Sequence, residues 1–207
     1  EAENLSEGAT VAADGYEDNL EKFQPSKVVD GDDTTRWASP AKLGQHWISL
    51  DYGKEISIQS FKIHWERTNA TKYRLEKSSD GTNWEPVVSF EKKPDSYQQI
   101  INLDEPINTQ HVRLFIEEFD PKGAPENGAE VTWNTVGIWE FETYAGKLEE
   151  PENTQDPQEV ADNLGLPGSI EGDSKKFTMP EVPEGFEISF VGADYEQILD
   201  RDLTVYQ

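Results

Sequence analysis

Between Gln45 and Ala145 the chain alternates apolar and polar residues in short runs that turn residues interrupt. The predicted turn YGKE separates the run QHWISLD from the run ISIQSFKIHW, residues 56–65. The second run places Phe61, Ile63 and Trp65 at every second position, which is the period of a half-buried strand. An Asp-Gly pair, which favours a hairpin turn, separates KYRLEKS from WEPVVSF. Similar runs follow at YQQIINL, HVRLFIEE and VGIWEFETY. Many short strands at this spacing, with no helical period, predict an all-β antiparallel sandwich.

The pattern changes after Gly146. The segment KLEEPENTQDPQEV is acidic, contains two prolines and has little apolar content, which is typical of an exposed linker. Strand-like FEISFVG and LTVYQ follow, and they indicate part of a second β-module that ends within a strand. The predicted organisation is a main domain at 1–146, an acidic linker at 147–160 and a partial module at 161–207.

Charge and cysteine content exclude several kinds of partner and chemistry. The 207-residue chain has a formal net charge of -24, which repels phosphate backbones and anionic lipid headgroups, so we expect no nucleic-acid and no membrane partner. It has no cysteine, which excludes disulfides, thiolate metal sites and a cysteine nucleophile.

Three carboxylates gather in one turn of the segment KVVDGDDTTRW, residues 27–37. An EF-hand loop starting at Asp30 would need glycine at its sixth position and glutamate at its twelfth, but Thr35 and Ala41 stand there. Two interpretations remain. Either the turn is solvated and its acids are incidental, or a distant carboxylate completes a cation site that joins two parts of the chain.

No pattern typical of a catalytic site occurs. His46, His64 and His111 stand singly in strand-like runs, and the motifs of serine hydrolases, phosphate loops and zinc proteases are absent. Glu117 and Glu118 are adjacent, and adjacent residues of a strand face opposite sides, so they cannot act as a glycosidase pair. We therefore expect a binding protein and not an enzyme.

The order of KVVDGDDTTRW, HWISLDYGKE, HWERTNATKY, HVRLFIEE and VGIWEFETY resembles the discoidin, or coagulation factor V/VIII type C, domain family, and in particular its bacterial family 32 carbohydrate-binding modules. The resemblance covers about residues 4 to 146 and implies an eight-stranded jelly-roll sandwich. The segment from Leu166 onwards resembles, more weakly, the start of the immunoglobulin-like modules that lie between such modules and catalytic domains.

The resemblance implies a structural calcium ion between the acidic turn and the last strand. Its ligands would be the Lys27 backbone oxygen, the carboxylates of Asp30 and Asp32, the carbonyl and hydroxyl of Thr35, the Trp139 carbonyl and the Glu140 side chain. Apolar residues flank Glu140 on both sides, and a buried unpaired carboxylate costs several kcal/mol, so Glu140 is the expected distant carboxylate.

The resemblance also implies that the ligand loops gather at one end of the sandwich, here WASPAKLGQ, ERTNAT and EFDPKGAPENGAEVTWNT, with Tyr16 and Glu17 nearby. Trp133 is the candidate stacking platform because it stands in a polar loop, and the candidate hydrogen-bonding residues are Glu66, Arg67 and Asn69. Glu66 stands at about the position where galactose-binding members carry arginine, which favours an amino sugar or an N-acetylhexosamine. The other tryptophans are expected in the core: Trp37, Trp47, Trp65, Trp84 and Trp139.

The function expected from the sequence is a non-catalytic, calcium-stabilised carbohydrate-binding module of a secreted or bacterial cell-surface glycosidase. Its partners would be a glycan that ends in a hexose or N-acetylhexosamine and a covalently linked catalytic domain. Two alternatives stay open: a phospholipid-membrane-binding discoidin domain, and a protein adhesion or spacer module without a sugar site.

Overall fold

A computed structural model describes residues 2–149 of the chain. Most of the predicted linker and the whole partial module at 161–207 lie outside the described residues. No helix within residues 2–149 is long and apolar enough to cross a membrane.

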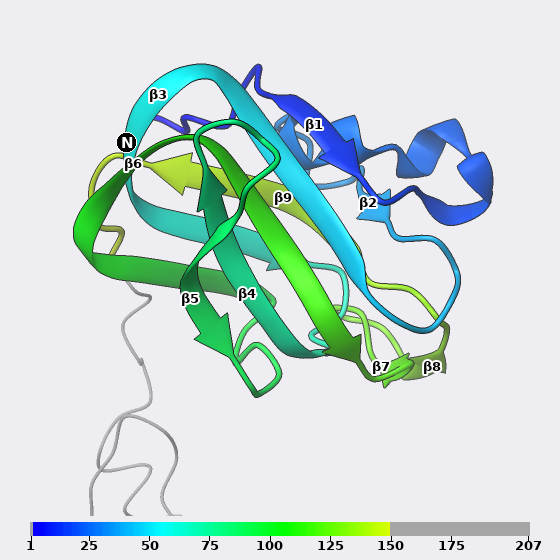
Figure 1. The fold of residues 1–207 in the computed structure, drawn as a ribbon. Coiled ribbons are helices and arrows are strands. Elements are labelled where there is room, and N and C mark those ends of the chain that lie inside the picture. Colours follow the sequence, from blue (N-terminus) through cyan, green and yellow to red (C-terminus); the bar gives the residue numbers. More distant parts are fainter. Residues whose placement is uncertain (1, 150–207) are drawn as a thin grey trace, which may run out of the picture. The chain divides into compact units, whose positions relative to one another are not determined.

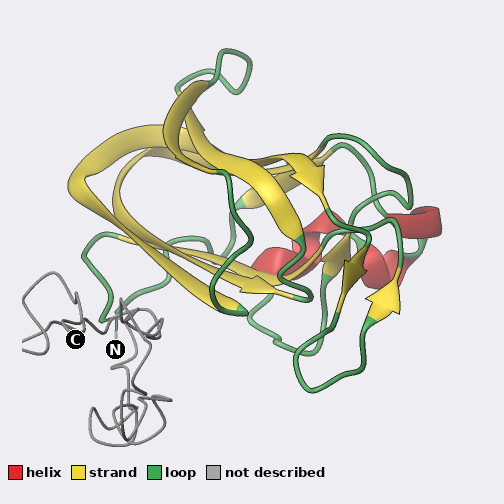
Figure 2. Ribbon diagram, turned by 90° about the horizontal axis from the view of Figure 1, so that it is seen from below, coloured by secondary structure: helices red, strands yellow, loops and turns green. Residues whose placement is uncertain are grey.

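Strands dominate the described residues, and the helical segments are short 3-10 turns (Figures 1 and 2). The strands are β1 (Thr10–Ala13), β2 (Trp37–Ala38), β3 (His46–Trp65), β4 (Ala70–Ser78), β5 (Glu85–Phe90), β6 (Gln98–Phe119), β7 (Lys122–Gly123), β8 (Val131–Thr132) and β9 (Gly137–Tyr144). The 3-10 turns are η1 (Glu17–Asn19), η2 (Glu21–Phe23) and η3 (Pro25–Val29).

The main sheet is antiparallel with the strand order β2-β9-β3-β6-β4-β5, and β1 pairs with β3. The first part of β3 pairs with β1 and with the end of β6, whereas its second part pairs with β9 and with the start of β6. Both long strands therefore bend from one layer of the sandwich into the other, and Figure 1 shows the two bends at its left edge. The expected all-β antiparallel sandwich is confirmed.

The strand boundaries differ from the sequence prediction at these bends. The residues YGKE, predicted as a turn, lie inside β3, where the register with β6 shifts between Asp51 and Ile56. Gly53 has φ of +70°, which ordinary residues rarely adopt, and it lies within this irregular stretch. The turn signal was real, but pairing with β6 resumes at Ile56 after the register shift, so β3 joins two predicted strands into one.

The core lies between the two layers and is built from the inward-facing residues of the long strands. Its largest fully buried side chains include Trp37, Trp65, Tyr73, Phe61 and Phe141. The expectation that all five remaining tryptophans belong to the core is wrong, because Trp47, Trp84 and Trp139 are only half-buried and lie outside the core cluster. Trp47, for example, stands at an outward position of β3 between the buried His46 and Ile48.

Several of the connecting segments gather at the right-hand end of the sandwich in Figure 1, which is called the loop end below. The 3-10 turns that follow β1 lie there, as does a separate two-stranded ribbon of β7 and β8. Lys122 pairs with Thr132 and Gly123 pairs with Val131 in this ribbon. The excursion from Asp120 to Thr135 that contains the ribbon carries Trp133, so the fold places the candidate platform at the loop end.

Candidate functional site

A pocket of about 310 Å³ opens at the loop end, between the 3-10 turns and the β7–β8 ribbon. Its lining residues are Glu17, Phe23, Arg36, Glu66, Arg67, Val131, Thr132, Trp133 and Thr135. The structure thus brings together three of the four predicted sugar-binding residues, Glu66, Arg67 and Trp133. The fourth, Asn69, does not line this pocket.

Trp133 is the exposed aromatic residue of the pocket, with 53% of its surface accessible. Its indole Nε1 donates a hydrogen bond of 2.6 Å to Glu17 Oε1, and its backbone N–H donates to the Pro121 carbonyl at 2.9 Å. Both bonds fix the ring relative to the pocket although the residue follows a two-residue strand. A fixed, exposed indole is the kind of surface on which the apolar face of a sugar stacks.

Two carboxylates, Glu17 and Glu66, line the same pocket, and each uses one oxygen to bond a neighbouring pocket residue. Glu17 is 8% exposed and accepts from the Trp133 indole, while Glu66 Oε2 accepts from Arg67 Nε at 3.1 Å. Within residues 2–149 no protein donor reaches Glu17 Oε2 or Glu66 Oε1. The pocket therefore offers two carboxylate oxygens whose positions are set by protein contacts.

The backbone beside Glu66 is equally restrained. The Glu66 N–H donates to the Gly137 carbonyl at 2.9 Å, and a Cβ at Gly137 would lie 2.8 Å from the Glu66 Cβ. Only glycine allows this close approach without a shift of the backbone. Glu66 is thus held against the start of β9 as well as by its side-chain bond.

Arg67 and Asn69 are buried, with 1% and 0% of their surfaces exposed. The Arg67 guanidinium donates to backbone carbonyls of the 120–135 excursion, and Asn69 Nδ2 donates to the carbonyls of Asp120 and Thr135. Both side chains are committed to protein acceptors below the pocket surface. Within residues 2–149 each of their side-chain nitrogens already bonds a protein acceptor, so no free nitrogen supports their predicted role as direct sugar ligands.

Arg36 and Phe23 also line the pocket, and no pattern in the sequence singled them out. The Arg36 guanidinium carbon lies 4.7 Å from the centre of the Phe23 ring and 5.2 Å from the centre of the Trp139 ring. Its Nε is buried and has no acceptor within the described residues. Cation–π stacking between two rings holds the guanidinium in place at the pocket wall.

The histidines lie outside this pocket, and each faces carboxylates. His46 Nδ1 is 2.8 Å from Asp14 Oδ2, and His64 lies between Asp33 Oδ1 at 3.0 Å and Glu126 Oε2 at 3.2 Å. His111 Nδ1 is 3.6 Å from Asp51 Oδ1. His46 and His64 connect β3 to loops, whereas His111 connects β6 to its paired strand β3. Within residues 2–149 these three side chains contact carboxylates, a backbone carbonyl and aromatic rings, and none bonds a hydroxyl nucleophile.

The acidic turn and the last strand meet, as the sequence prediction requires. Asp30 accepts from the Thr35 hydroxyl at 2.8 Å and from the Asp32 N–H at 3.1 Å, and that same N–H lies 3.1 Å from Glu140 Oε1. Lys27 Nζ is 3.6 Å from Asp30 Oδ2. The turn is therefore folded on itself and stands directly against Glu140, which follows Trp139 on β9.

The Asp32 carboxylate, a predicted calcium ligand, bonds within its own turn. Asp32 Oδ1 accepts from the Thr34 N–H at 2.9 Å and from the Thr34 hydroxyl at 2.6 Å. The Thr34 hydroxyl and backbone bonds lower the pKa of Asp32 below its ordinary value. In this structure the side chain of Asp32 closes the turn, and its backbone N–H is the group that contacts Glu140.

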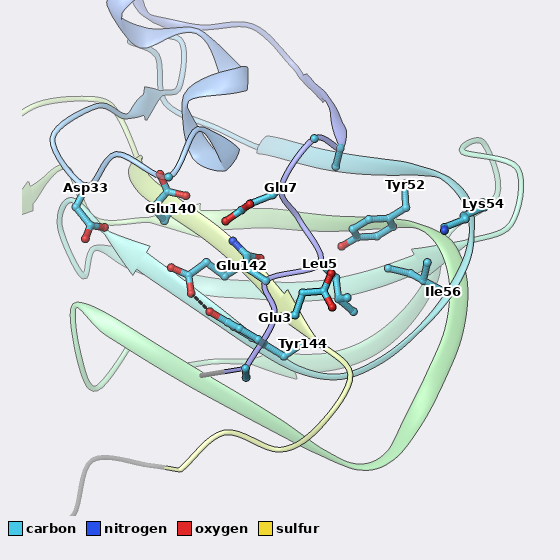
Figure 3. Close-up of a pocket in the computed structure, with 15 residues that line it drawn as sticks. Glu3, Leu5, Glu7, Asp33, Tyr52, Lys54, Ile56, Glu140, Glu142 and Tyr144 are labelled. Atoms are coloured by element: carbon cyan, nitrogen blue, oxygen red, sulfur yellow. Dashed lines mark hydrogen bonds between the residues drawn. The ribbon is translucent and has the colours of Figure 1, made fainter.

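Glu140 is a buried carboxylate, and within the described residues one of its oxygens is unpaired. It is 3% exposed, and its Oε2 is buried with no donor within residues 2–149. Burial, helped by the nearby charges of Asp30 and Glu142, raises the pKa of Glu140 to about 8. Figure 3 shows Glu140 with Asp33, Glu142 and Glu7 around a hollow of about 850 Å³.

These oxygens fit a hard cation better than a transition metal. No three histidine, cysteine, aspartate or glutamate side chains of the described residues converge closely enough to hold a metal alone. An ion beside Glu140 would therefore need backbone and hydroxyl oxygens as well, such as those of Lys27, Thr35 and Trp139. Calcium accepts such mixed oxygen sets with flexible geometry.

Comparisons with known proteins agree with this fold. The F5/8 type C domain family matches residues 9–140. The structure resembles chitosan-binding module 1 of a chitosanase/glucanase from Paenibacillus sp. IK-5, with 26% identity, a TM-score of 0.58, and coverage of 69% of this chain and 98% of that chain. Module 2 of the same enzyme, solved with chitotriose, has 27% identity and a TM-score of 0.55, with 68% and 99% coverage.

A third structure is similar in fold alone. CpGH89CBM32-5 from Clostridium perfringens, in complex with GalNAc-β-1,3-galactose, has 19% identity and a TM-score of 0.57, with 69% of this chain and all 100% of that chain covered. No curated protein matches the chain by sequence. Because the family match spans more than half of the chain and includes both the acidic turn and Glu140, this protein belongs to the F5/8 type C domain family.

Proposed function

We propose that the chain binds glycans through the loop-end pocket and that the preferred residue is a hexosamine with a free amino group. The observation that carries the proposal is the pair of carboxylates Glu17 and Glu66, each anchored by one oxygen and open at the other, beside the exposed ring of Trp133. A protonated amine donates charge-assisted hydrogen bonds to such oxygens, and these bonds are stronger than those of a hydroxyl.

The other pocket residues have complementary roles in this proposal. Trp133 stacks on the apolar face of the sugar ring, and Arg36, held between Phe23 and Trp139, donates to hydroxyl oxygens. Glu66 is neutralised in part by Arg67, whereas within residues 2–149 no lysine or arginine pairs with Glu17. Glu17 is therefore the carboxylate with most to gain from a cationic ligand.

The two chitosan-binding modules support this choice of sugar. They are 26% and 27% identical to this chain, and one of them was solved with chitotriose. Chitosan is a polymer of glucosamine, so its residues carry the amine that the two carboxylates would bind. A glutamate where galactose-binding members carry arginine agrees with the same preference.

We further propose that calcium occupies the contact between the acidic turn and Glu140. The buried oxygen of Glu140 supports this, because a cation would supply the missing partner. When bound, the ion would neutralise Glu140 and link the turn to β9, and its binding free energy would add to the stability of the fold. Asp30 and Thr35 are placed to contribute oxygens on the turn side.

The biological setting is proposed from the same comparisons. A module of this family joined to a secreted or cell-surface glycosidase would hold that enzyme near its glycan. Such tethering raises the effective concentration of substrate at the linked active site without any chemistry in this chain.

Calorimetric titration of the 207-residue chain in calcium-containing buffer tests the function. We expect binding of chitotriose, weaker binding of its fully N-acetylated form, and little binding of galactose. Equal affinity for the amine and N-acetyl forms would contradict the hexosamine preference. Absence of binding to all three sugars, together with binding to anionic vesicles, would support the phospholipid alternative.

A further inference from the structure

Arg67 is buried at the point where the two ends of the 120–135 excursion return to the sandwich. Its Nη1 donates to the Pro121 carbonyl at 2.9 Å at the outgoing end. Its Nη2 donates at the returning end to the carbonyls of Trp133 at 3.2 Å and Thr135 at 2.7 Å, and also to the Thr135 hydroxyl at 3.1 Å. One guanidinium therefore joins both ends of the excursion.

The same guanidinium also reaches the pocket. Its Nε donates to Glu66 Oε2 at 3.1 Å, so it contacts a proposed amine-binding carboxylate and the backbone of the proposed stacking residue at once. We call the Arg67 bonds to the two ends of the excursion the clamp. Asn69 adds to the clamp, since its amide donates to the Asp120 carbonyl at 2.8 Å and to the Thr135 carbonyl at 3.1 Å. Within the described residues, every Arg67 nitrogen that could turn toward a sugar already has a protein acceptor.

We infer that Arg67 is a positioning residue that preorganises the sugar site by fixing Trp133 and Glu66 relative to each other. The inference rests on the proposed function of the loop-end pocket and assigns Arg67 a role different from direct sugar contact. The inference also implies that sugar affinity depends on the conformation of the 120–135 excursion as well as on its residues.

The physical basis is the cost of ordering a loop when a ligand binds. A loop that is already closed in its bound conformation does not lose that conformational freedom again on binding. Arginine suits the task because its planar group presents five N–H donors in a fixed arrangement, whereas lysine offers a single ammonium that cannot reach acceptors on both sides. Other bonds hold the 120–135 excursion locally, among them the β7–β8 ribbon, the bridge between Arg67 and Pro125 and the hydrogen bond from the Tyr97 hydroxyl to the Ala124 carbonyl at 2.9 Å. The Arg67 guanidinium differs from them because it bonds both ends of the excursion.

The experiment compares Arg67→Lys with a matched control, Arg113→Lys. Arg113 also pairs with a carboxylate, Glu76, and also stacks on aromatic rings, Trp84 and Phe115, but it lies outside the pocket. Chitotriose is titrated into each variant at a temperature where circular dichroism shows it to be folded. We expect Arg67→Lys to weaken chitotriose binding about tenfold, as the loss of loop order and of Glu66 alignment implies, and Arg113→Lys to leave it unchanged.

A double-mutant cycle separates positioning from simple loss of stability. If Arg67 acts through Trp133, then Arg67→Lys costs clearly less affinity in a Trp133→Ala background than in the wild type. Additive losses would contradict the inference, and so would wild-type affinity in folded Arg67→Lys. If Arg67→Lys does not fold, Thr135→Val removes one hydroxyl acceptor of the clamp, and unchanged chitotriose affinity in that variant would also overturn the inference.

The outcomes distinguish this inference from the proposed function. Absence of chitotriose binding by the wild-type chain refutes the function. Binding by the wild type together with full binding by the clamp variants refutes only the positioning role of Arg67.

Discussion

The contact between the acidic turn and β9 contains a buried carboxylate, as does the loop-end pocket, but the oxygens of the two are paired differently. Glu140 on β9 is 3% exposed and leaves one buried oxygen without a donor within residues 2–149. Glu17 in the pocket is 8% exposed and is anchored by the Trp133 indole, while Glu66 is anchored by Arg67. The first arrangement leaves a buried polar oxygen unpaired, which is unfavourable and which the proposed cation would relieve. In the second, protein donors pair one oxygen of each carboxylate, and the other oxygens are the ones proposed to bind a ligand.

The difference separates two roles that acidic residues have in one small domain. At the acidic turn the proposed partner of Glu140 is a structural calcium ion, so removal of this ion should lower the stability of the fold. At the pocket the missing partner is the ligand, so changes there should alter affinity and leave stability nearly constant. Changes in one region that altered the property assigned to the other region would contradict this separation of stability from affinity.

The largest effect is expected from removal of calcium. An ion present at a thousand times its dissociation constant stabilises a fold by about 4 kcal/mol, and its chelation should lower the melting temperature by roughly 10 °C. Asp30→Ala should give the same decrease without chelator. Differential scanning calorimetry measures both, with Trp133→Ala as the control that keeps the full calcium response. A melting curve that chelation does not change would show the turn to be merely solvated.

The ion-free protein should show an unusual pH dependence. The folded pKa of Glu140 is about 8, above its ordinary value of 4.5, so the folded state binds the proton more tightly than the unfolded state. Stability should therefore decrease as pH rises from about 4.5 to about 8, and calcium should reverse this trend. Thermal melts with and without chelator, on the wild type and on Glu140→Gln, measure it. The glutamine variant should lose the pH dependence in this range.

Replacement of the platform should affect binding and not folding. Trp133→Ala removes an exposed ring and should cost about 1–3 kcal/mol of chitotriose binding, with a melting temperature near that of the wild type. Trp65→Ala is the opposite control, because loss of a fully buried tryptophan should cost about 3–5 kcal/mol of stability. A large decrease in melting temperature for Trp133→Ala would mean that the two regions are not separable.

The smallest effect distinguishes the two pocket carboxylates. Glu17→Gln removes the charge but keeps an acceptor for the Trp133 indole, so chitotriose affinity should fall about tenfold and become less dependent on salt. Glu66→Gln should have a weaker effect, because Arg67 already neutralises part of that charge. Titrations at low and high salt compare them, and the reverse ranking would assign the main amine contact to Glu66.

The sandwich could be predicted because each strand is encoded by the alternation of apolar and polar residues within its own short run. Alternating apolar residues give strands, and a strand such as 56–65 keeps its inward face wherever it pairs. The bends within β3 and β6 could not be predicted in this way, since a turn signal such as YGKE does not say whether pairing continues through it. Similarly, alternation alone does not show that Trp47 faces outward while Trp65 faces the core.

The candidate site was only partly accessible from the sequence. Trp133 was identifiable from its polar loop, and Glu140 from its apolar neighbours. The family resemblance placed Glu17 near the ligand loops. Its contact with Trp133 joins positions 116 residues apart, and no local sequence pattern predicts that contact. Arginine is a residue type that binds sugars, and only the structure shows that Arg67 is 1% exposed and that its nitrogens already bond protein acceptors.

The most direct test follows the indole N–H signals of the six tryptophans by NMR during a chitotriose titration in calcium-containing buffer. Trp133 should shift most, because its Nε1 bonds Glu17 within the proposed site. Trp47 on β3 and Trp84, which immediately precedes β5, do not line the pocket and should stay in place. A saturating titration in which Trp133 does not move, or in which Trp47 and Trp84 move most, would contradict the assignment of sugar binding to the loop-end pocket.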